Sequence, residues 1–292
     1  MHLFTFGRME KAALDKLQSF FSEPHNVVIT THKNPDGDAM GSSLAVARYL
    51  QKKKQLVTVI APTDYPDFLH WLPGDNNVLV YTDDHDRANG IIEKADLIIC
   101  LDFNALSRIG EMEEPVRKSS AVKMMIDHHQ QPEQFAAYTI SEPDICSTCQ
   151  LVFEWMVDMG DKALIDKEIA TCIYTGIMTD TGSFRFPSTT ARTHRIVADL
   201  IEFGANGADI YNRVMDGSSE SRIRLLGFAL SEKLRVLPEY KTAYISLSAE
   251  ELERFNFQKG DTEGFVNYAL SVKGILFAAI FMDKDNLRKV SF

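Results

Sequence analysis

NVVITTHKNPDGDAMGS, residues 26–42, joins a short β-branched run to a turn and then to the start of a helix. The run at 26–31 has the composition of a buried strand, and Pro35 and Gly37 mark a turn after it. The helix is expected from about Met40 to Lys53. A strand, a short turn and a helix in this order predict the beginning of an alternating α/β pattern.

The alternation continues along the first half of the chain. Three further apolar runs are predicted to be strands, at 56–60, 95–101 and 121–126. Helices are expected at 10–21, 84–94 and 111–119. The pattern predicts the α/β fold class, with a parallel, Rossmann-like sheet that is covered by helices on both faces.

The second half of the chain is expected to be mostly helical and then to change character. Helices are predicted at 148–159, 167–179, 190–203, 208–215 and 221–234. A smaller α+β domain should follow, with strands at 242–247, 275–282 and 287–292 and helices at 249–255 and 263–271. We therefore expect a first domain over 1–218, a helical linker over 219–236 and a second domain over 237–292. Because the sequence stops within an expected strand, we expect this second domain to be incomplete.

Length and charge restrict the classes of protein that fit. The chain has 292 residues, which favours two domains, and its net charge is −10 at pH 7. Residues 231–292 are balanced in charge, so the acidic excess lies in residues 1–230. Long nucleic acids bind mainly through basic side chains, which argues against a long duplex as the partner. Four cysteines, no membrane-length apolar run and no signal-like start favour a cytoplasmic protein without membrane association.

Aspartate and histidine are concentrated in four segments, at 31–39, 101–104, 126–129 and 175–182. The first three follow predicted strands, and the carboxyl ends of parallel strands meet at one edge of a sheet. Each segment alone has an ordinary explanation, because Asp-Gly-Asp suits a helix cap and adjacent histidines are usually exposed. Together they gather at least four carboxylates and two imidazoles, and crowded carboxylates repel one another unless a cation binds them.

This combination of side chains predicts a metal site. Mixed carboxylate and imidazole ligands suit Mn²⁺, Mg²⁺, Fe²⁺ or Zn²⁺ rather than a thiolate centre. Two divalent ions about 3.5–4 Å apart can clamp a phosphoryl group and activate a water molecule. From the residues alone we expect a dinuclear hydrolase whose ligand has few phosphates.

The same segments resemble, in order and spacing, the four motifs of the DHH phosphoesterase superfamily. The resemblance is carried by H-x-x-P-D-G-D-A-x-G-S at 32–42, Asp102, Asp-His-His at 127–129 and G-x-x-x-D-T-G at 176–182. Residues 179–186 and 205–210 are similar to the bacterial group that hydrolyses short RNA and 3′-phosphoadenosine-5′-phosphate (pAp). The resemblance implies two divalent ions, with Mn²⁺ expected and Mg²⁺ as the alternative, and a small nucleotide or short RNA as substrate.

The resemblance also implies a role for each matching position. The ligands of one ion would be His32, Asp36 and Asp102, and those of the other Asp38, Asp102, His128 and Asp180. His129 would contact the scissile phosphate and help to protonate the leaving oxygen, and Asp127 would orient a histidine. The weaker candidates for phosphate contacts, for which structural roles are equally open, are Asn34, Arg108 and Arg185.

Several functions share such a metal core. The family's glycine-rich stretch with a substrate-binding histidine is not found before Phe292, which leaves the length of the substrate open. The main alternative is a cyclic-dinucleotide phosphodiesterase, acting on c-di-AMP or pApA. An inorganic pyrophosphatase would need a basic second domain, and a processive DNA exonuclease would need more chain and more positive charge. A non-catalytic nucleotide-binding protein would lack a metal-motif residue, and none is missing. A homodimer is compatible with the sequence.

Overall fold

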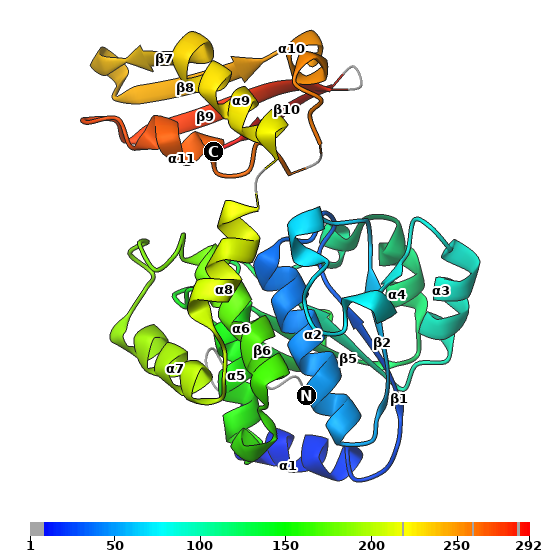
Figure 1. Cartoon of the computed structure of the whole chain (residues 1–292). Helices are drawn as coiled ribbons and strands as arrows, with labels where there is room; N and C mark the ends of the chain where they lie inside the picture. The colour runs from blue at the N-terminus through cyan, green and yellow to red at the C-terminus, as the bar shows by residue number, and fades with distance from the viewer. Residues whose placement is uncertain (1–8, 218, 259, 285–286) are drawn as a thin grey trace. The chain divides into compact units, whose positions relative to one another are not determined.

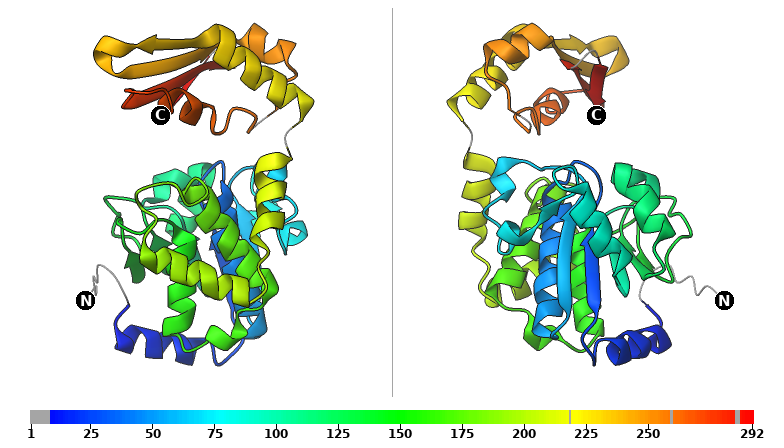
Figure 2. Two further views of the ribbon diagram at one scale, coloured as in Figure 1. Left: turned by 60° about the vertical axis from the view of Figure 1, so that its left-hand side comes forward. Right: turned by 90° about the vertical axis from the view of Figure 1, so that its right-hand side faces the viewer.

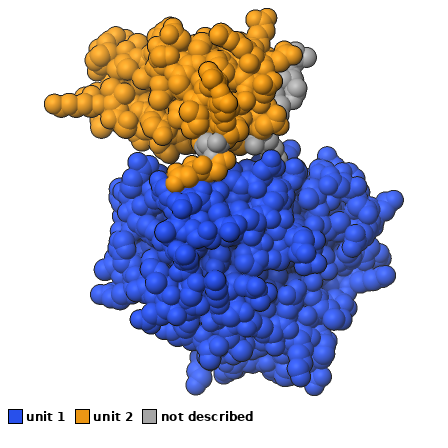
Figure 3. Space-filling view, viewed as in Figure 1, with its two compact units in different colours: residues 1–214 blue, residues 215–292 orange. Residues whose placement is uncertain are grey.

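The computed structural model describes residues 9–217, 219–258, 260–284 and 287–292. The chain divides into two compact units, the first ending at Val214 and the second beginning at Met215 (Figures 1 and 3). Within the described residues, unit 1 holds a six-stranded sheet and unit 2 a four-stranded sheet. Among the described helices, none combines the length and the apolar character needed to cross a membrane.

The first part of unit 1 follows the pattern of the opening stretch. Strand β1 (Asn26–Thr30) is buried at every position after its first residue. Helix α2 (Gly37–Lys52) begins earlier than predicted. The reason is a cap, because the side chain of Asp36 accepts hydrogen bonds from two backbone N–H groups in the first turn of the helix.

Unit 1 is built on a parallel sheet with the strand order β3-β2-β1-β4-β5-β6. The other strands are β2 (Leu56–Ala61), β3 (Leu79–Val80), β4 (Leu97–Leu101), β5 (Val122–Asp127) and β6 (Tyr138–Ser141). Every pairing between neighbouring strands is parallel, which confirms the predicted fold class. The order of connection reverses between β1 and β4, which is the switch point where open α/β sheets bind ligands.

Helices cover both faces of this sheet (Figures 1 and 2). The helices of unit 1 besides α2 are α1 (Lys11–Phe20), α3 (His85–Glu93), α4 (Glu113–Lys118), α5 (Thr148–Asp158), α6 (Lys167–Asp180), α7 (Ala191–Glu202) and α8 (Gly207–Tyr211). On one face, Val28 and Ile98 of the strands share a core with Ile92 of α3 and Val116 of α4. Helices α2 and α5 contact β1 and β5, and α6 packs on α2.

Some elements of unit 1 differ from the prediction. The short strands β3 and β6 were not predicted, and β6 is an exception in a segment after Asp127 that is mostly helical, as expected. Both lie at the margins of the sheet, where partial burial leaves only a weak pattern in the sequence. Helix α8 was expected to reach residue 215, but it ends at Tyr211 and continues as a π-helical turn over 212–216.

Unit 2 is the smaller α+β unit that the sequence predicts. Its elements are α9 (Glu220–Phe228), β7 (Leu234–Leu237), β8 (Thr242–Leu247), α10 (Ala249–Arg254), α11 (Phe265–Leu270), β9 (Phe277–Lys284) and β10 (Leu287–Ser291). The strand order is β10-β9-β8-β7, with β8 and β9 parallel and the other pairs antiparallel.

The range 219–236, assigned to a helical linker, contains α9, a π-helical turn and β7. Leu225 and Ala229 are buried in the core of unit 2, so this segment packs with the sheet that follows it. The helix expected over 221–234 therefore ends before Leu234, because β7 pairs with β8.

Two glycines allow α2 and α6 to pack closely. A Cβ atom on Gly41 would lie 2.5 Å from the carbonyl oxygen of Cys172 in α6. On Gly176 it would lie 2.7 Å from Oδ1 of Asp38 and 2.2 Å from Sγ of Cys149. Real Cβ atoms do not approach other atoms so closely, so both positions require glycine at this helix separation. The close approach carries Asp38 of α2 alongside the carboxyl half of α6.

We expect Gly41→Ala to lower the free energy of unfolding by roughly 1–3 kcal/mol, because the backbone of α6 must move away from α2. The matched control is Gly90→Ala in α3, where an added Cβ meets no atom within 4 Å. Better helix propensity should stabilise that variant by up to about 1 kcal/mol. Denaturant unfolding of both variants measures the difference. Wild-type stability of Gly41→Ala would contradict the tight contact.

Candidate metal centre

Three overlapping groups of side chains meet at the carboxyl edge of the large sheet, with the possible ligand atoms of each group within 4.8 Å of one another. The groups are His32, Asp36 and Asp102; Asp38, His128 and Asp180; and Asp102, His128 and His129. Residues that follow β1, β4 and β5 meet here, as the parallel topology predicts. Helices supply the remaining groups, because Asp38 lies in the first turn of α2 and Asp180 ends α6.

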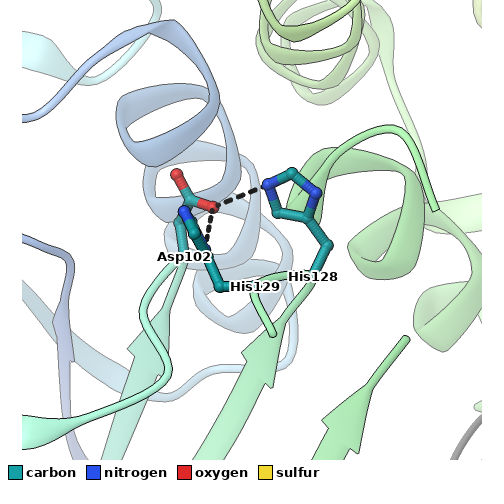
Figure 4. Close-up of side chains that lie close together, drawn as sticks. All are labelled: Asp102, His128 and His129. Atoms are coloured by element: carbon teal, nitrogen blue, oxygen red, sulfur yellow. Dashed lines mark ion pairs between the residues drawn. The ribbon is translucent and has the colours of Figure 1, made fainter. Parts of the chain in front are cut away.

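Asp102 lies between the other residues of the cluster. Its side chain is buried, and its Oδ2 lies 3.4 Å from Nε2 of His32. Its Oδ1 lies 3.6 Å from Nε2 of His128 and 3.8 Å from Nδ1 of His129 (Figure 4). The residue has a left-handed backbone with φ of 64°, which is uncommon outside glycine and often marks functional sites. Its N–H donates to the carbonyl of Ile126, so pairing with β5 holds this turn.

Two histidines are oriented in the same way. Nδ1 of His32 lies 2.9 Å from the carbonyl oxygen of Lys33, and Nδ1 of His128 lies 3.1 Å from that of Ile145. Each carbonyl favours a proton on Nδ1 and leaves Nε2 facing the carboxylates. Nε2 of His128 lies 3.2 Å from Oδ2 of Asp180. A carbonyl behind the ring and carboxylates in front of it are typical of metal-binding histidines.

His129 is held differently. Its Nδ1 lies 2.7 Å from Oδ1 of Asp127, and its backbone N–H donates to Oδ2 of the same carboxylate. Asp127 is fully buried at the end of β5. The hydrogen bond that the His129 ring donates to Asp127 raises the pKa of His129, against the opposing effects of burial and of the positive charge of Arg108. Because Nδ1 of His129 is bonded to Asp127, its Nε2 is the ring nitrogen available to another group.

The first turn of α5 donates two backbone hydrogen bonds to the Asp38 side chain. The motifs predicted Asp38 at the site but not this contact. Oδ2 of Asp38 accepts a hydrogen bond from the N–H of Thr148 at 2.6 Å, and Oδ1 accepts one from the N–H of Cys149 at 2.9 Å. The first N–H groups of a helix have no partner within the helix and are available to an anion. This helix was predicted to begin at residue 148, and the hydroxyl of Ser147 accepts the N–H of Gln150. A predicted helix start was therefore the available signal for these donors.

Asp36 has two tasks. Its Oδ1 caps α2, as the ordinary explanation of Asp-Gly-Asp requires. Its Oδ2 lies 3.8 Å from Nε2 of His32, which places this second oxygen at the cluster. The capping interpretation and the ligand interpretation of this residue are thus compatible, because each uses a different oxygen.

The charges of the cluster are mutually dependent. Burial raises the pKa of Asp180, and the negative charges of Asp102 and Asp36 raise it further, to about 8. Burial and the charge of Asp102 likewise hold the pKa of Asp38 well above its usual range. Burial opposes charge on His32, yet contact with Asp102 and the charges of Asp36 and Asp102 raise its pKa to about 9. Despite burial, His32 and His128 lower the pKa of Asp102 to about 2.

These shifts reflect the crowding of acidic groups in the cluster. Raised carboxylate pKa values arise because negative groups are crowded and buried, and a divalent ion would remove that cost. Carboxylate and imidazole donors without thiolates fit a hard or intermediate divalent ion. The Asp/His cluster therefore has the chemistry of a metal site.

The three weaker candidates for phosphate contacts lie in exposed positions. The N–H of Asn34 donates to the hydroxyl of Thr63, and Nε of Arg185 donates to the carbonyl of Gly182 in its own turn. Arg108 is close enough to His129 for its charge to act on the ring. Substrate contacts by these three residues remain predictions.

An open parallel sheet with a buried Asp/His cluster at its switch point defines the class of this molecule, an α/β protein with a candidate dinuclear metal centre. The family of the N-terminal domain of DHH proteins matches residues 26–177. The chain belongs to the DHH family, which confirms the resemblance seen in the four motifs.

The chain is also similar to individual proteins of known name or structure. The chain is 33% identical over 205 residues to the bifunctional oligoribonuclease and PAP phosphatase NrnA of Thermus thermophilus, covering 70% of this chain and 58% of that protein. It is 25% identical over 270 residues to the Bacillus subtilis protein of the same name, covering 91% and 80%. A crystal structure of an exopolyphosphatase-related protein from Bacteroides fragilis matches with a TM-score of 0.93 and 43% identity, covering 96% of this chain and 82% of that chain.

We expect Asp180→Asn to separate two effects of this side chain: its destabilisation of the metal-free protein and its contribution to Mn²⁺ binding. An aspartate with a raised pKa in the folded state destabilises the protein increasingly as pH rises from about 4 through the raised value of about 8. The metal-free variant should therefore be at least as stable as wild type at pH 8. With Mn²⁺ at about 100 times the dissociation constant, wild type should gain about 2.7 kcal/mol and the variant clearly less.

Thermal unfolding at pH 6 and pH 8, with chelator and with Mn²⁺, measures both effects of Asp180→Asn. An equal gain from Mn²⁺ in the variant and in wild type would show that Asp180 does not bind the ion.

Proposed function

We propose that this chain is a two-metal phosphoesterase that hydrolyses short oligoribonucleotides and removes the 3′-phosphate of pAp. The observation that supports this most is the position of Asp102, whose two oxygens face His32 on one side and His128 on the other. In this arrangement Asp102 would help to hold both of two divalent ions, which together would supply the chemistry of a two-metal hydrolase. Similarity to the two NrnA proteins supports the substrate class.

The residues of the cluster divide between two ions. One would be held by His32, Asp36 and Asp102, and the other by Asp38, Asp102, His128 and Asp180. We propose Mn²⁺ as the ion and Mg²⁺ as the alternative, because both accept the carboxylate oxygens that predominate in the cluster. When bound, such a pair of ions clamps a phosphoryl group and activates the attacking water.

His129 would supply the proton for the leaving oxygen. Asp127 occupies Nδ1, so Nε2 is the nitrogen that can reach a substrate. The hydrogen bond to Asp127 raises the pKa of His129, which favours a protonated ring near neutral pH. Arg108, whose charge acts on this ring, would attract the same phosphate, and Asn34 and Arg185 are further candidates.

We also propose a cytoplasmic location and a small substrate. All four cysteines are buried and unpaired, as is common in the reducing cytoplasm. The acidic charge of residues 1–230 favours a small nucleotide or a short RNA over a long duplex. A homodimer remains a prediction.

We expect Mn²⁺-dependent release of phosphate from pAp and of mononucleotides from an RNA dinucleotide. Chelator should abolish both reactions. Asp102→Ala should lower kcat/KM by at least about a hundredfold, because both ions lose a shared ligand.

Phosphate detection and chromatography measure these reactions, with Asp158→Ala, on the last turn of α5, as a variant of the same kind outside the cluster. If metal-loaded wild type hydrolyses neither substrate, the proposal is wrong. Turnover of c-di-AMP or pApA instead would identify a cyclic-dinucleotide phosphodiesterase.

We expect His129→Gln to lower kcat by about 10²–10⁴-fold, the usual contribution of a general acid, with little change in the affinity for Mn²⁺. The amide of glutamine keeps hydrogen-bonding capacity but cannot deliver a proton at neutral pH. Steady-state kinetics and calorimetric Mn²⁺ titration of the same preparation separate the two roles. A large loss of Mn²⁺ affinity would instead make His129 a metal ligand.

A further inference from the structure

Thr148 contacts two carboxylates of the candidate metal centre, those of Asp102 and Asp38. It is fully buried at the first position of α5. Its hydroxyl donates a 2.8 Å hydrogen bond to Oδ1 of Asp102, and its backbone N–H donates a 2.6 Å hydrogen bond to Oδ2 of Asp38. One residue therefore joins the carboxylate that follows β4 to the carboxylate in the first turn of α2.

The hydroxyl is the closest fixed partner among the contacts described for the Asp102 carboxylate. The ring nitrogens of His32, His128 and His129 lie farther away, at 3.4, 3.6 and 3.8 Å from the carboxylate oxygens. The short hydrogen bond from Thr148 therefore restrains rotation of the Asp102 carboxylate. Since Oδ1 has two lone pairs, the hydroxyl occupies one and leaves the other, with both of Oδ2, for cations.

We propose that Thr148 is a positioning residue that fixes the plane of the Asp102 carboxylate and its separation from Asp38, and so sets the affinity of the paired metal site. The inference rests on the proposed function in one respect, that these carboxylates bind divalent ions. Hydrogen bonds behind a ligand orient it, and their loss typically costs 10- to 100-fold in metal affinity or activity.

The hydroxyl can be removed without changing the shape of the side chain. Thr148→Val keeps the volume and the backbone N–H to Asp38, and removes only the bond to Asp102. Thr148→Ser keeps the hydroxyl. The matched control is Thr175→Val in α6, because Thr175 is equally buried and its hydroxyl donates 2.8 Å to the carbonyl of Thr171 in its own helix. A general effect of burying valine in place of threonine would appear in both valine variants.

Mn²⁺ titration calorimetry of metal-free wild type and the three variants, with melting curves from circular dichroism, tests the proposal. The expected result is a 10- to 100-fold weaker affinity for Mn²⁺ in Thr148→Val, recovery to within about threefold in Thr148→Ser, and wild-type affinity in Thr175→Val. If Thr148→Val does not fold, Thr148→Ala replaces it in the comparison.

Wild-type Mn²⁺ affinity in folded Thr148→Val would overturn the proposal, as would equal losses in Thr148→Val and Thr175→Val. The titration contains no substrate, so it decides the role of Thr148 whether or not pAp is hydrolysed. Failure of the wild type to bind Mn²⁺ at all would overturn this inference and the metal centre together, whereas binding without turnover would reject only the substrates.

Discussion

The crowding of carboxylates around Asp102 is the constraint on which the rest of unit 1 depends. Asp38 and Asp102 are buried, and Asp180 is close enough for its pKa to rise to about 8. Such an arrangement costs free energy in the absence of cations, and the fold offsets part of it with the N–H groups of α5 and with His32 and His128. A stable fold would not gather these groups for packing alone, which is why the cluster is best explained as a metal centre.

The surrounding packing holds the cluster in place. Gly41 and Gly176 let α2 and α6 approach until the cluster residues of both helices meet, and Cys149 fills the space between them. The left-handed turn at Asp102 is held by pairing with β5. Local strain and close backbone contacts are therefore found at the site, where the surrounding structure is rigid enough to maintain them.

Prediction from the sequence succeeded where the pattern was long and buried. The apolar runs of β1, β4 and β5 lie in the middle of the sheet, and their β-branched and aliphatic composition reveals them. Strands β3, β6 and β7 are short and partly exposed, so their sequences carry little pattern. The helix expected to reach 234 stopped earlier because pairing of β7 with β8, a tertiary interaction, outweighed local helical spacing.

The sequence by itself determined the candidate ligand types, their order and the edge of the sheet where they gather, because parallel strands bring their carboxyl ends together. It determined the family in the same way, through motifs that are local in the chain. Only the tertiary structure decided which oxygens and nitrogens face one another, and that Thr148 and Cys149 hold Asp38 from 110 and 111 residues away. Such contacts depend on how helices pack across the fold, and hydrophobic periodicity fixes which face of a helix is buried but not which atoms meet there.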